Sequence, residues 1–332
     1  MLMTTPTDSL RPETDFDFSV VLIPDTQYAN RYYSDLVEKM ARWIVDNAAA
    51  LSIKAVVHLG DIVDVGKNEQ EFQWARRCMD IVTDAGLPLL VCIGNHDYED
   101  FEVSREAPFF RSYFGLSHYR NQPWFREAFE EGKPDNLYGI LEMGGGVRFL
   151  YLMLEFGPRE EVLAWADEVL SRHADCPAVL FTHSYMYING ERTKPGDDHN
   201  PKDYAGMTGA LDGEDIWNRL VRKHPNMTAV FNGHHVPGPV SFRVDLGDHG
   251  NPVLQSYQNW QHSEEGGAGR IRILQYSLAR RELRMTVYNP STGVYEDKEG
   301  YTIVQPLPSL VCTPAASPAE ESPLPETAAD AG

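Results

Sequence analysis

The chain has 332 residues, of which 42% are hydrophobic and 23% are charged, values that are usual for soluble globular proteins. Its length allows one large α/β domain or two small ones with a substantial buried core. The formal net charge of −20 argues against a surface that binds nucleic-acid backbones or anionic membranes, because both require clustered Lys and Arg. A metal site could still attract an anionic substrate locally.

Four cysteines are widely spaced and include no C-x-x-C pair, so neither a disulfide framework nor a thiolate zinc site is expected. Residues 1–16 form a polar leader that lacks the apolar stretch of a signal peptide. No later segment reaches about 18 uninterrupted apolar residues, the length needed to span a membrane. We therefore expect a cytoplasmic protein with no membrane partner, and nothing in the composition indicates an oligomeric state.

Three apolar runs near the start of the chain each predict a buried strand that ends in a polar cluster. They span residues 18–23, 54–59 and 89–92. Between them, over 36–45 and 72–82, apolar residues recur every three to four positions, and this spacing predicts amphipathic helices. Strands that alternate with helices in this way are typical of a parallel sheet, whose ligands collect at the carboxyl ends of the strands.

Residues 98–135 are rich in aromatic side chains and show no regular pattern. A surface loop does not normally carry so many rings, so we expect a packed insertion. It either flanks the active cleft or forms a satellite core with no contact to substrate.

The rest of the chain predicts further strands and two helices. Strands are expected at 137–143, 147–155, 178–181, 228–232, 240–245, 253–258, 271–276 and 283–288, and helices at 158–173 and 213–224. A long polar loop covers residues 190–202. The folded part is expected to end near Val304, and residues 305–332, rich in Pro, Ala and Glu, are expected to be a disordered tail.

Five of the predicted strands end in side chains that can bind a metal ion. The groups are Asp25 with Gln27, Asp61 with Asp64, Asn95 with His96, His183 alone, and His234 with His235. One buried His or Asp at a strand end is more often structural, but five such ends favour a shared metal site. Oxygen and imidazole donors without thiolate suit Mn, Fe or Zn, and a carboxylate such as that of Asp61 can bridge two cations about 3.5–4 Å apart.

The strand-end groups also follow a recognisable order. The motifs are Asp25-Thr26-Gln27, Gly60-Asp61-Ile62-Val63-Asp64, Gly94-Asn95-His96-Asp97, His183, and Gly233-His234-His235-Val236. In order and spacing they resemble the signature of the calcineurin-like metallophosphoesterases, although each motif alone is a weak signal. The resemblance covers residues 25–236 and implies a four-layer α/β/β/α sandwich, with one catalytic domain over residues 17–304.

The resemblance implies a role for each of these residues. Asp61 would bridge two cations, Asn95, His183 and His234 would complete the ligands of one, and Asp25 and Gln27 would lie on the other. His96 would be the general acid near the leaving-group oxygen, and Asp64 would orient it. Asp97 would support the turn rather than touch substrate.

Two departures from the family pattern fall on the same cation. Gln27 stands where the family usually has His, and Val236 stands where a ligand His is expected. An amide oxygen is a poorer donor to Zn or Fe than imidazole, and valine cannot bind a metal. We therefore expect a weaker, harder site that Mn or Mg could fill. His235 and His249 are candidates to supplement it or to contact substrate, although either could be an ordinary loop histidine.

The function implied by the resemblance is hydrolysis of a small phosphate mono- or diester. Metal-bound water would attack phosphorus, and His96 would assist departure of the alcohol. Two alternatives stay open. The same scaffold could break a non-phosphate bond, because Gln27 and Val236 alter Lewis acidity, or it could bind a ligand without catalysis. Retention of Asp61, Asp64 and His96 counts against a purely binding role.

Overall fold

The computed structural model describes residues 15–307, so most of the expected leader and most of the expected tail lie outside the described residues. The first three strands are parallel neighbours and alternate with helices, as predicted. In chain order these elements are β1 (Phe18–Ile23), α1 (Gln27–Tyr32), α2 (Ser34–Asn47), β2 (Ile53–His58), α3 (Glu69–Asp84) and β3 (Leu89–Val91).

Four later strands complete the first sheet. They are β11 (Ile271–Ser277), β12 (Glu282–Asn289), β13 (Val294–Glu296) and β14 (Ile303–Pro306). The sheet has the order β13-β12-β11-β1-β2-β3, with β14 also paired to β12. Strand β11 runs antiparallel to β1, with Leu22 opposite Arg272. Residues 271–306 therefore add strands to the sheet that begins with β1.

The second sheet has the order β4-β5-β6-β7-β8-β10-β9. Its strands are β4 (Phe125–Ala128), β5 (Leu137–Gly144), β6 (Val147–Leu154), β7 (Ala178–Thr182), β8 (Met227–Asn232), β9 (Val240–Leu246) and β10 (Pro252–Gln258). The run β6-β7-β8-β10 is parallel. The carboxyl ends of β7, β8 and β10 consequently share one edge of this sheet.

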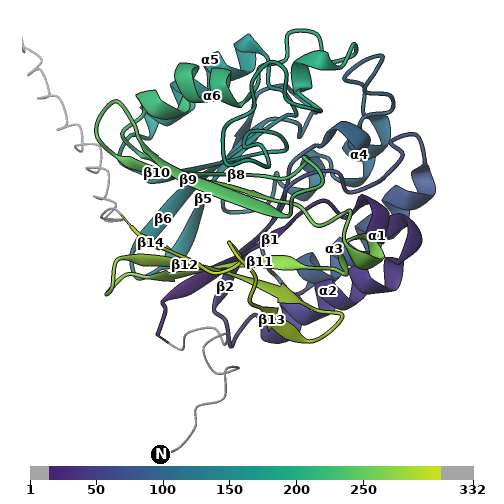
Figure 1. Cartoon of the computed structure of the whole chain (residues 1–332), viewed down its shortest axis with the longest axis horizontal. Helices are drawn as coiled ribbons and strands as arrows, with labels where there is room; N and C mark the ends of the chain where they lie inside the picture. Colours follow the sequence, from purple (N-terminus) through teal and green to yellow (C-terminus); the bar gives the residue numbers. More distant parts are fainter. Residues whose placement is uncertain (1–14, 308–332) are drawn as a thin grey trace, which may run out of the picture.

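The two sheets pack face to face and each carries helices on its outer face (Figure 1). In β1, Val21 and Ile23 pack toward the helices, whereas Val20 and Leu22 face the other sheet, because successive strand residues point to opposite faces. The second sheet is covered by α5 (Glu160–Arg172) and α6 (Gly213–Arg219). The predicted four-layer α/β/β/α sandwich is confirmed.

The aromatic-rich segment 98–135 divides its rings between two places. It contains α4 (Pro108–Tyr113), a short 3-10 helix (Leu116–His118) and β4. Phe110 and Phe114 are buried in the core beneath the helices of the first sheet, and Tyr119 and Trp124 are buried between the sheets. Phe101 instead lies 5.2 Å from the ring of His96, measured between ring centroids. The segment therefore both extends the core and reaches the predicted site.

His58, the last residue of β2, is a fully buried histidine. Its Nδ1 atom accepts the N–H of Gly60 at 3.2 Å, and its Nε2 atom lies 3.0 Å from Thr26 Oγ1. Burial, with His183 nearby, lowers the pKa of His58 to about 3. The folded protein thus keeps this imidazole neutral at pH values where an unfolded chain protonates it.

The burial of His58 is expected to make the folded protein less stable in mild acid. Between the unfolded pKa of about 6.5 and the folded pKa of about 3, the unfolded state binds one more proton, so stability falls as pH falls below about 6.5. We expect His58→Gln to reduce the slope of unfolding free energy against pH by about 1.4 kcal/mol per pH unit in this window. Urea titrations at several pH values measure both slopes. His249→Gln, which removes an exposed histidine, is the control, and equal slopes for wild type and His58→Gln would contradict the assignment.

Candidate metal centre

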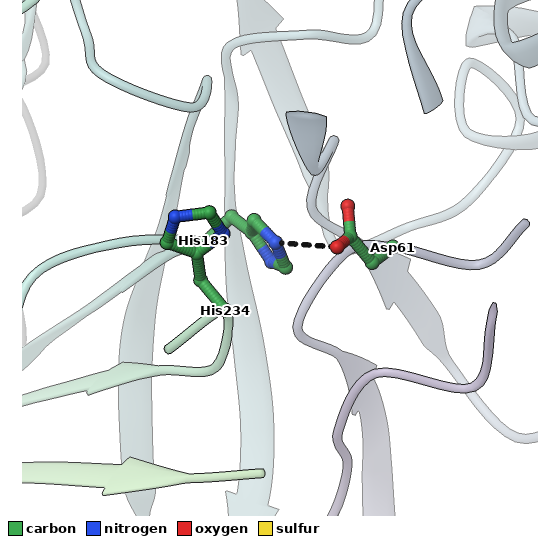
Figure 2. A group of neighbouring side chains, drawn as sticks. All are labelled: Asp61, His183 and His234. Atoms are coloured by element: carbon green, nitrogen blue, oxygen red, sulfur yellow. Dashed lines mark ion pairs between the residues drawn. The ribbon is translucent and has the colours of Figure 1, made fainter. Parts of the chain in front are cut away.

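The predicted donor residues converge at one edge of the sandwich, where strands of both sheets end. Each is at most 6% exposed: Asp25, Gln27, Asp61, Asn95, His183 and His234. Donor atoms of Asp61, His183 and His234 all lie within 4.8 Å of one another (Figure 2). Asp61 follows a strand of the first sheet, whereas both histidines follow strands of the second. The site therefore spans the gap between the sheets.

The hydrogen bonds of His183 define which of its nitrogens can bind a cation. Its Nδ1 atom lies 2.7 Å from the carbonyl oxygen of Leu59, and because a carbonyl only accepts, Nδ1 carries the hydrogen. The other nitrogen, Nε2, lies 3.1 Å from Asp61 Oδ2. Burial lowers the pKa of His183, but the Asp61 and Asp25 carboxylates raise it to about 9. Nε2, which has no hydrogen-bond partner among residues 15–307, faces the Asp61 carboxylate and is the nitrogen that can bind a cation.

The same reasoning applies to His234. Its Nε2 atom lies 2.9 Å from the carbonyl oxygen of His199, so Nε2 carries the hydrogen and Nδ1 keeps its lone pair. Burial, with His235 and His183 close by, lowers the pKa of His234 well below its usual value. The imidazole is thus neutral and suited to metal binding.

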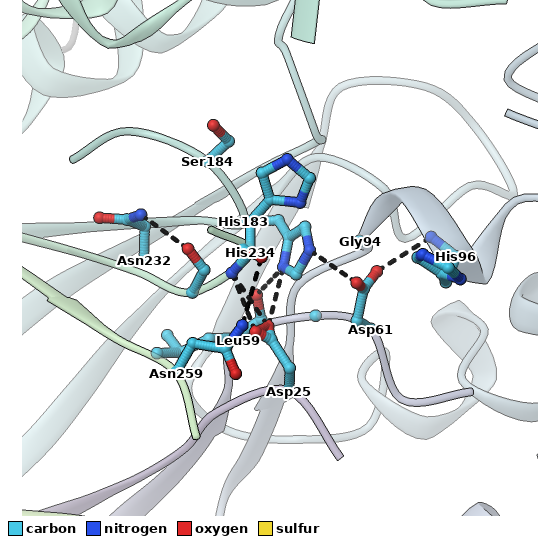
Figure 3. Close-up of polar contacts among 12 residues, drawn as sticks. Asp25, Leu59, Asp61, Gly94, His96, His183, Ser184, Asn232, His234 and Asn259 are labelled. Atoms are coloured by element: carbon cyan, nitrogen blue, oxygen red, sulfur yellow. Dashed lines mark hydrogen bonds and ion pairs between the residues drawn. The ribbon is translucent and has the colours of Figure 1, made fainter. Parts of the chain in front are cut away.

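The two aspartates lie on either side of His183 (Figure 3). Asp25 accepts the backbone N–H of His234 with both carboxylate oxygens, at 3.1 and 2.9 Å. Burial raises the pKa of Asp25 to about 8, and the neighbouring Asp61 adds to the rise against the attraction of His183. Burial also raises the pKa of Asp61, but His183 and His96 outweigh it and leave that pKa lowered. Such crowding of carboxylates is relieved by a bound cation.

The buried side-chain atoms without a hydrogen-bond partner within residues 15–307 include two amide oxygens of the predicted donor set. They belong to Gln27 and Asn95, the two predicted amide ligands. A buried oxygen without a partner is costly unless something absent from the protein chain satisfies it. Amide oxygens are accepted ligands of hard divalent cations. These residues therefore fit the metal ions that the sequence predicts.

The backbone around the donors is held in unusual conformations. Asp61 and His234 have positive φ values of 50° and 75°, which are uncommon for residues other than glycine. A Cβ atom on Gly94 would lie 2.2 Å from Asp61 Oδ1, and one on Gly233 would lie 2.5 Å from Asp25 Oδ1. Glycine is therefore required in these two motifs because backbone passes directly against a carboxylate.

His96 lies at the border of this group, with its side chain 27% exposed. Its backbone N–H donates to Asp61 Oδ1 at 2.9 Å (Figure 3). Its Nδ1 atom lies 2.8 Å from the carbonyl oxygen of Asp64, so Nδ1–H donates and Nε2 is left free. The carboxylate of Asp64 is 3.8 Å from Nδ1 and is paired with Arg31 instead. Asp64 thus holds His96 through its main chain.

Asp97 braces the two loops that carry Asp61 and Asn95. Its carboxylate accepts the N–H groups of Gly94 at 2.8 Å, Ile62 at 2.9 Å and Val63 at 3.3 Å. Burial, with Asp61 nearby, raises the pKa of Asp97 to about 7. This geometry agrees with a supporting place for Asp97 in the turn.

The structure separates the two candidate supplementary histidines. His249 is exposed on the turn between β9 and β10, with its ring 3.0 Å from the carbonyl oxygen of Lys223. That turn precedes β10 and lies at the opposite end of the strands, which corresponds to the alternative of an ordinary loop histidine. His235 is fully buried beside His234, and its Nε2 atom lies 3.0 Å from Ser184 Oγ. Only His235 remains near the centre.

Residues after β10 reach the same edge and were missed in the sequence. The Nδ2 group of Asn259 donates to the carbonyl oxygens of His234 at 3.2 Å and His235 at 3.3 Å. The Gln261 side chain is 7% exposed, and its Oε1 atom has no hydrogen-bond partner in the described part of the chain. Asn259 and Gln261 follow the predicted strand 253–258. Polar residues after a buried apolar run, the pattern seen at the other five strand ends, could therefore have identified them.

A family model described as calcineurin-like phosphoesterase matches residues 18–238. The chain belongs to the calcineurin-like phosphoesterase family. Members of this family are metal-dependent phosphoesterases, and the Asp and His cluster at the strand ends fits that description. The predicted family membership is confirmed.

The chain is also similar to a protein of Bacillus subtilis and to solved structures of phosphatases. It is 28% identical over 308 residues to the uncharacterized protein YvnB of Bacillus subtilis (strain 168), which covers 89% of this chain but only 22% of that protein. A dimetal phosphatase from Danio rerio has a similar fold, with a TM-score of 0.54, 16% identity, and coverage of 83% of this chain and 97% of that one. Purple acid phosphatase PPD1 from yellow lupin has a TM-score of 0.53, 11% identity, and coverage of 91% and 57%. Among the described helices, none is long and apolar enough to cross a membrane.

Proposed function

We propose that this phosphoesterase uses two divalent cations to hydrolyse a small phosphate mono- or diester, with His96 protonating the departing alcohol. The observation that carries the proposal is the convergence of buried donor atoms, two of them oxygens without partners, from five strand ends. Beside them, the partly exposed His96 has one nitrogen free. A purely structural cluster would satisfy these atoms within the protein.

The residues present can be divided between two cations. Asp61 would contact both, Asn95, His183 and His234 would complete one set of ligands, and Asp25 and Gln27 would belong to the other. When bound, such a pair activates a water molecule and neutralises negative charge that develops on the phosphate oxygens. The hydrogen bonds to Leu59 and His199 place the hydrogen of each neutral imidazole on one nitrogen, so the other nitrogen would offer its lone pair to a cation.

The two donor sets differ in kind. One contains two imidazoles, which suits Zn, Fe or Mn, whereas the other contains oxygens alone, which suits Mn or Mg. Val236 supplies no donor, whereas Gln261 and His235 each have a buried polar atom without a hydrogen-bond partner among the described residues. We therefore infer that the oxygen-only site binds its cation more weakly and loses it first.

His96 is positioned to act on the leaving group. Its Nδ1–H bond to the Asp64 carbonyl fixes the ring, so Nε2 is the atom that donates a proton to the alcohol oxygen. The backbone N–H of the same residue holds Asp61 Oδ1. His96 would thereby link the carboxylate proposed to contact both cations with the group that assists departure of the alcohol.

The oxygen-only site also favours a second candidate function. Without an imidazole, its cation would be a different Lewis acid, and the bond broken need not be a phosphate ester. A substrate panel with matched phosphate and non-phosphate leaving groups separates this candidate from the first.

Metal content and turnover test the proposed function directly. On protein prepared without chelator, we expect mass spectrometry to find near two cations per chain and a generic phosphodiester or phosphomonoester to be hydrolysed. Chelation should abolish turnover and excess Mn should restore it, with the weaker site refilling last. Val236→His, which adds an imidazole where the family usually has one, should raise retention of the second cation. One cation or fewer per chain, with no turnover in excess Mn, would overturn the proposal.

A further inference from the structure

A row of partly exposed rings begins at His96 and follows one side of the metal centre. Phe101 lies 5.2 Å from His96 between ring centroids, and Tyr204 packs edge-on against Phe101 at 5.4 Å. The hydroxyl of Tyr204 lies 3.3 Å from His199 Nδ1. Tyr204 and His199 are in turn 6.4 and 6.2 Å from the ring of His234. The row therefore connects the predicted proton donor to a predicted metal ligand.

We propose that Phe101 and Tyr204 form a leaving-group subsite that selects alcohols bearing a planar ring. The proposal rests on the proposed function of His96, whose Nε2 atom is the proton donor. The alcohol oxygen must then lie about 3 Å from Nε2, since Nδ1 is bonded to Asp64. Phe101 contacts the same imidazole, and the proposal places the first carbons of the alcohol against it.

The chemistry of the subsite favours a ring over a flexible chain. Phe101 and Tyr204 meet at an interplanar angle of 81°, so they present one ring face and one ring edge. A third planar group packs well in such a corner because aromatic rings prefer offset or edge-to-face contacts. The hydroxyl of Tyr204 and the imidazole of His199 add polar atoms at the rim, where a heteroatom of the ring can be bonded.

The subsite is held rigidly by two segments that are distant in the sequence. A Cβ atom on Gly206 would lie 2.3 Å from the carbonyl oxygen of Phe101, so backbone packs on backbone here. The Ala205 N–H donates to Glu102 Oε2 at 3.4 Å. Arg105 donates to the carbonyl oxygen of Phe156 at 2.8 Å. The rings are therefore positioned before substrate arrives, as selective binding requires.

Benzyl phosphate and ethyl phosphate provide the test, because their alcohols have similar acidity and only one carries a ring. We expect the wild-type enzyme to have the higher kcat/KM for benzyl phosphate. Phe101→Leu, which keeps apolar bulk without the ring, should lower the benzyl-to-ethyl ratio about tenfold, and Phe101→Tyr should preserve it. Phe242→Ala removes a 44% exposed ring from β9 as the control and should leave the ratio unchanged. An unchanged ratio in Phe101→Leu would overturn the subsite.

A binding measurement keeps this test independent of turnover. Calorimetry with Mn-loaded protein compares benzylphosphonate and ethylphosphonate, which are not hydrolysed. Tighter binding of benzylphosphonate by the wild-type protein, lost in Phe101→Leu, supports the subsite. If neither ester is turned over, this result still supports the subsite, and only the proposed hydrolysis is contradicted. Equal binding of the two phosphonates by the wild-type protein overturns the subsite whatever the activity.

Discussion

We expect His96→Ala to lower kcat about 10²–10⁴-fold while the cation content stays at the wild-type level. Alanine keeps the backbone N–H that donates to Asp61 Oδ1, so the substitution removes the proton donor and leaves that contact with the predicted metal ligand. Steady-state kinetics, with mass spectrometry of the same sample, measures both quantities. Retention of wild-type turnover with metals bound would remove His96 from the proposed reaction.

The matched control for this variant is Asp64→Asn. The carbonyl of residue 64, which holds His96 at 2.8 Å, is unchanged by it, whereas the pairing of the carboxylate with Arg31 is lost. We therefore expect a much smaller fall in kcat than for His96→Ala. A fall of equal size would mean that the Asp64 carboxylate itself, 3.8 Å from Nδ1, acts on the imidazole.

The second large effect is expected for Asp61→Asn. This change removes the charge that would contact both cations and leaves an amide facing His183, so the cations should bind far more weakly. We expect at least one cation per chain to be lost and turnover to fall by more than about 10³-fold, since bound metal supplies several kcal/mol of transition-state stabilisation. Metal analysis and kinetics in excess Mn check the two parts separately.

A stability measurement distinguishes loss of metal from loss of fold in this variant. Added Mn should raise the melting temperature of the wild-type protein, because a ligand that binds only the folded state stabilises it, and should raise that of Asp61→Asn far less. In the presence of chelator the two proteins should unfold cooperatively at similar temperatures. Full metal content in Asp61→Asn would show that Asp61 is not the shared ligand.

Strand ends could be predicted from the sequence because they combine two strong local signals. A buried apolar run such as 18–23 sets the strand, and a polar cluster such as that at Asp25 marks its carboxyl end. Parallel pairing then brings such ends to one edge. The family resemblance supplied what local signals lack, namely that a second sheet brings His183 and His234 to the same place.

Features that depend on tertiary packing could not be predicted in this way. The carbonyl oxygens of Leu59 and His199 determine which nitrogen of His183 and of His234 is available to a metal ion. Because every residue has a carbonyl oxygen, the sequence does not show which ones make these contacts. His249 was a candidate for the site because its residue type is suitable, with an ordinary loop histidine as the alternative, and the direction of β10 places it at the other end of the sheet. Asp64 was expected to orient His96, but no local sequence pattern indicates that its main-chain carbonyl, rather than its carboxylate, contacts the imidazole.

The donors of the metal centre come from both sheets, and this has a consequence for how the protein matures. Asp25, Asp61 and Asn95 follow strands of the first sheet, and His183 and His234 follow strands of the second. During synthesis the ribosome releases the carboxylates long before the last imidazole, so a complete coordination shell forms only after the long chain segment between them has closed. On the proposed function, metal would therefore bind late, and bound cations would join loops of the two sheets after both had formed.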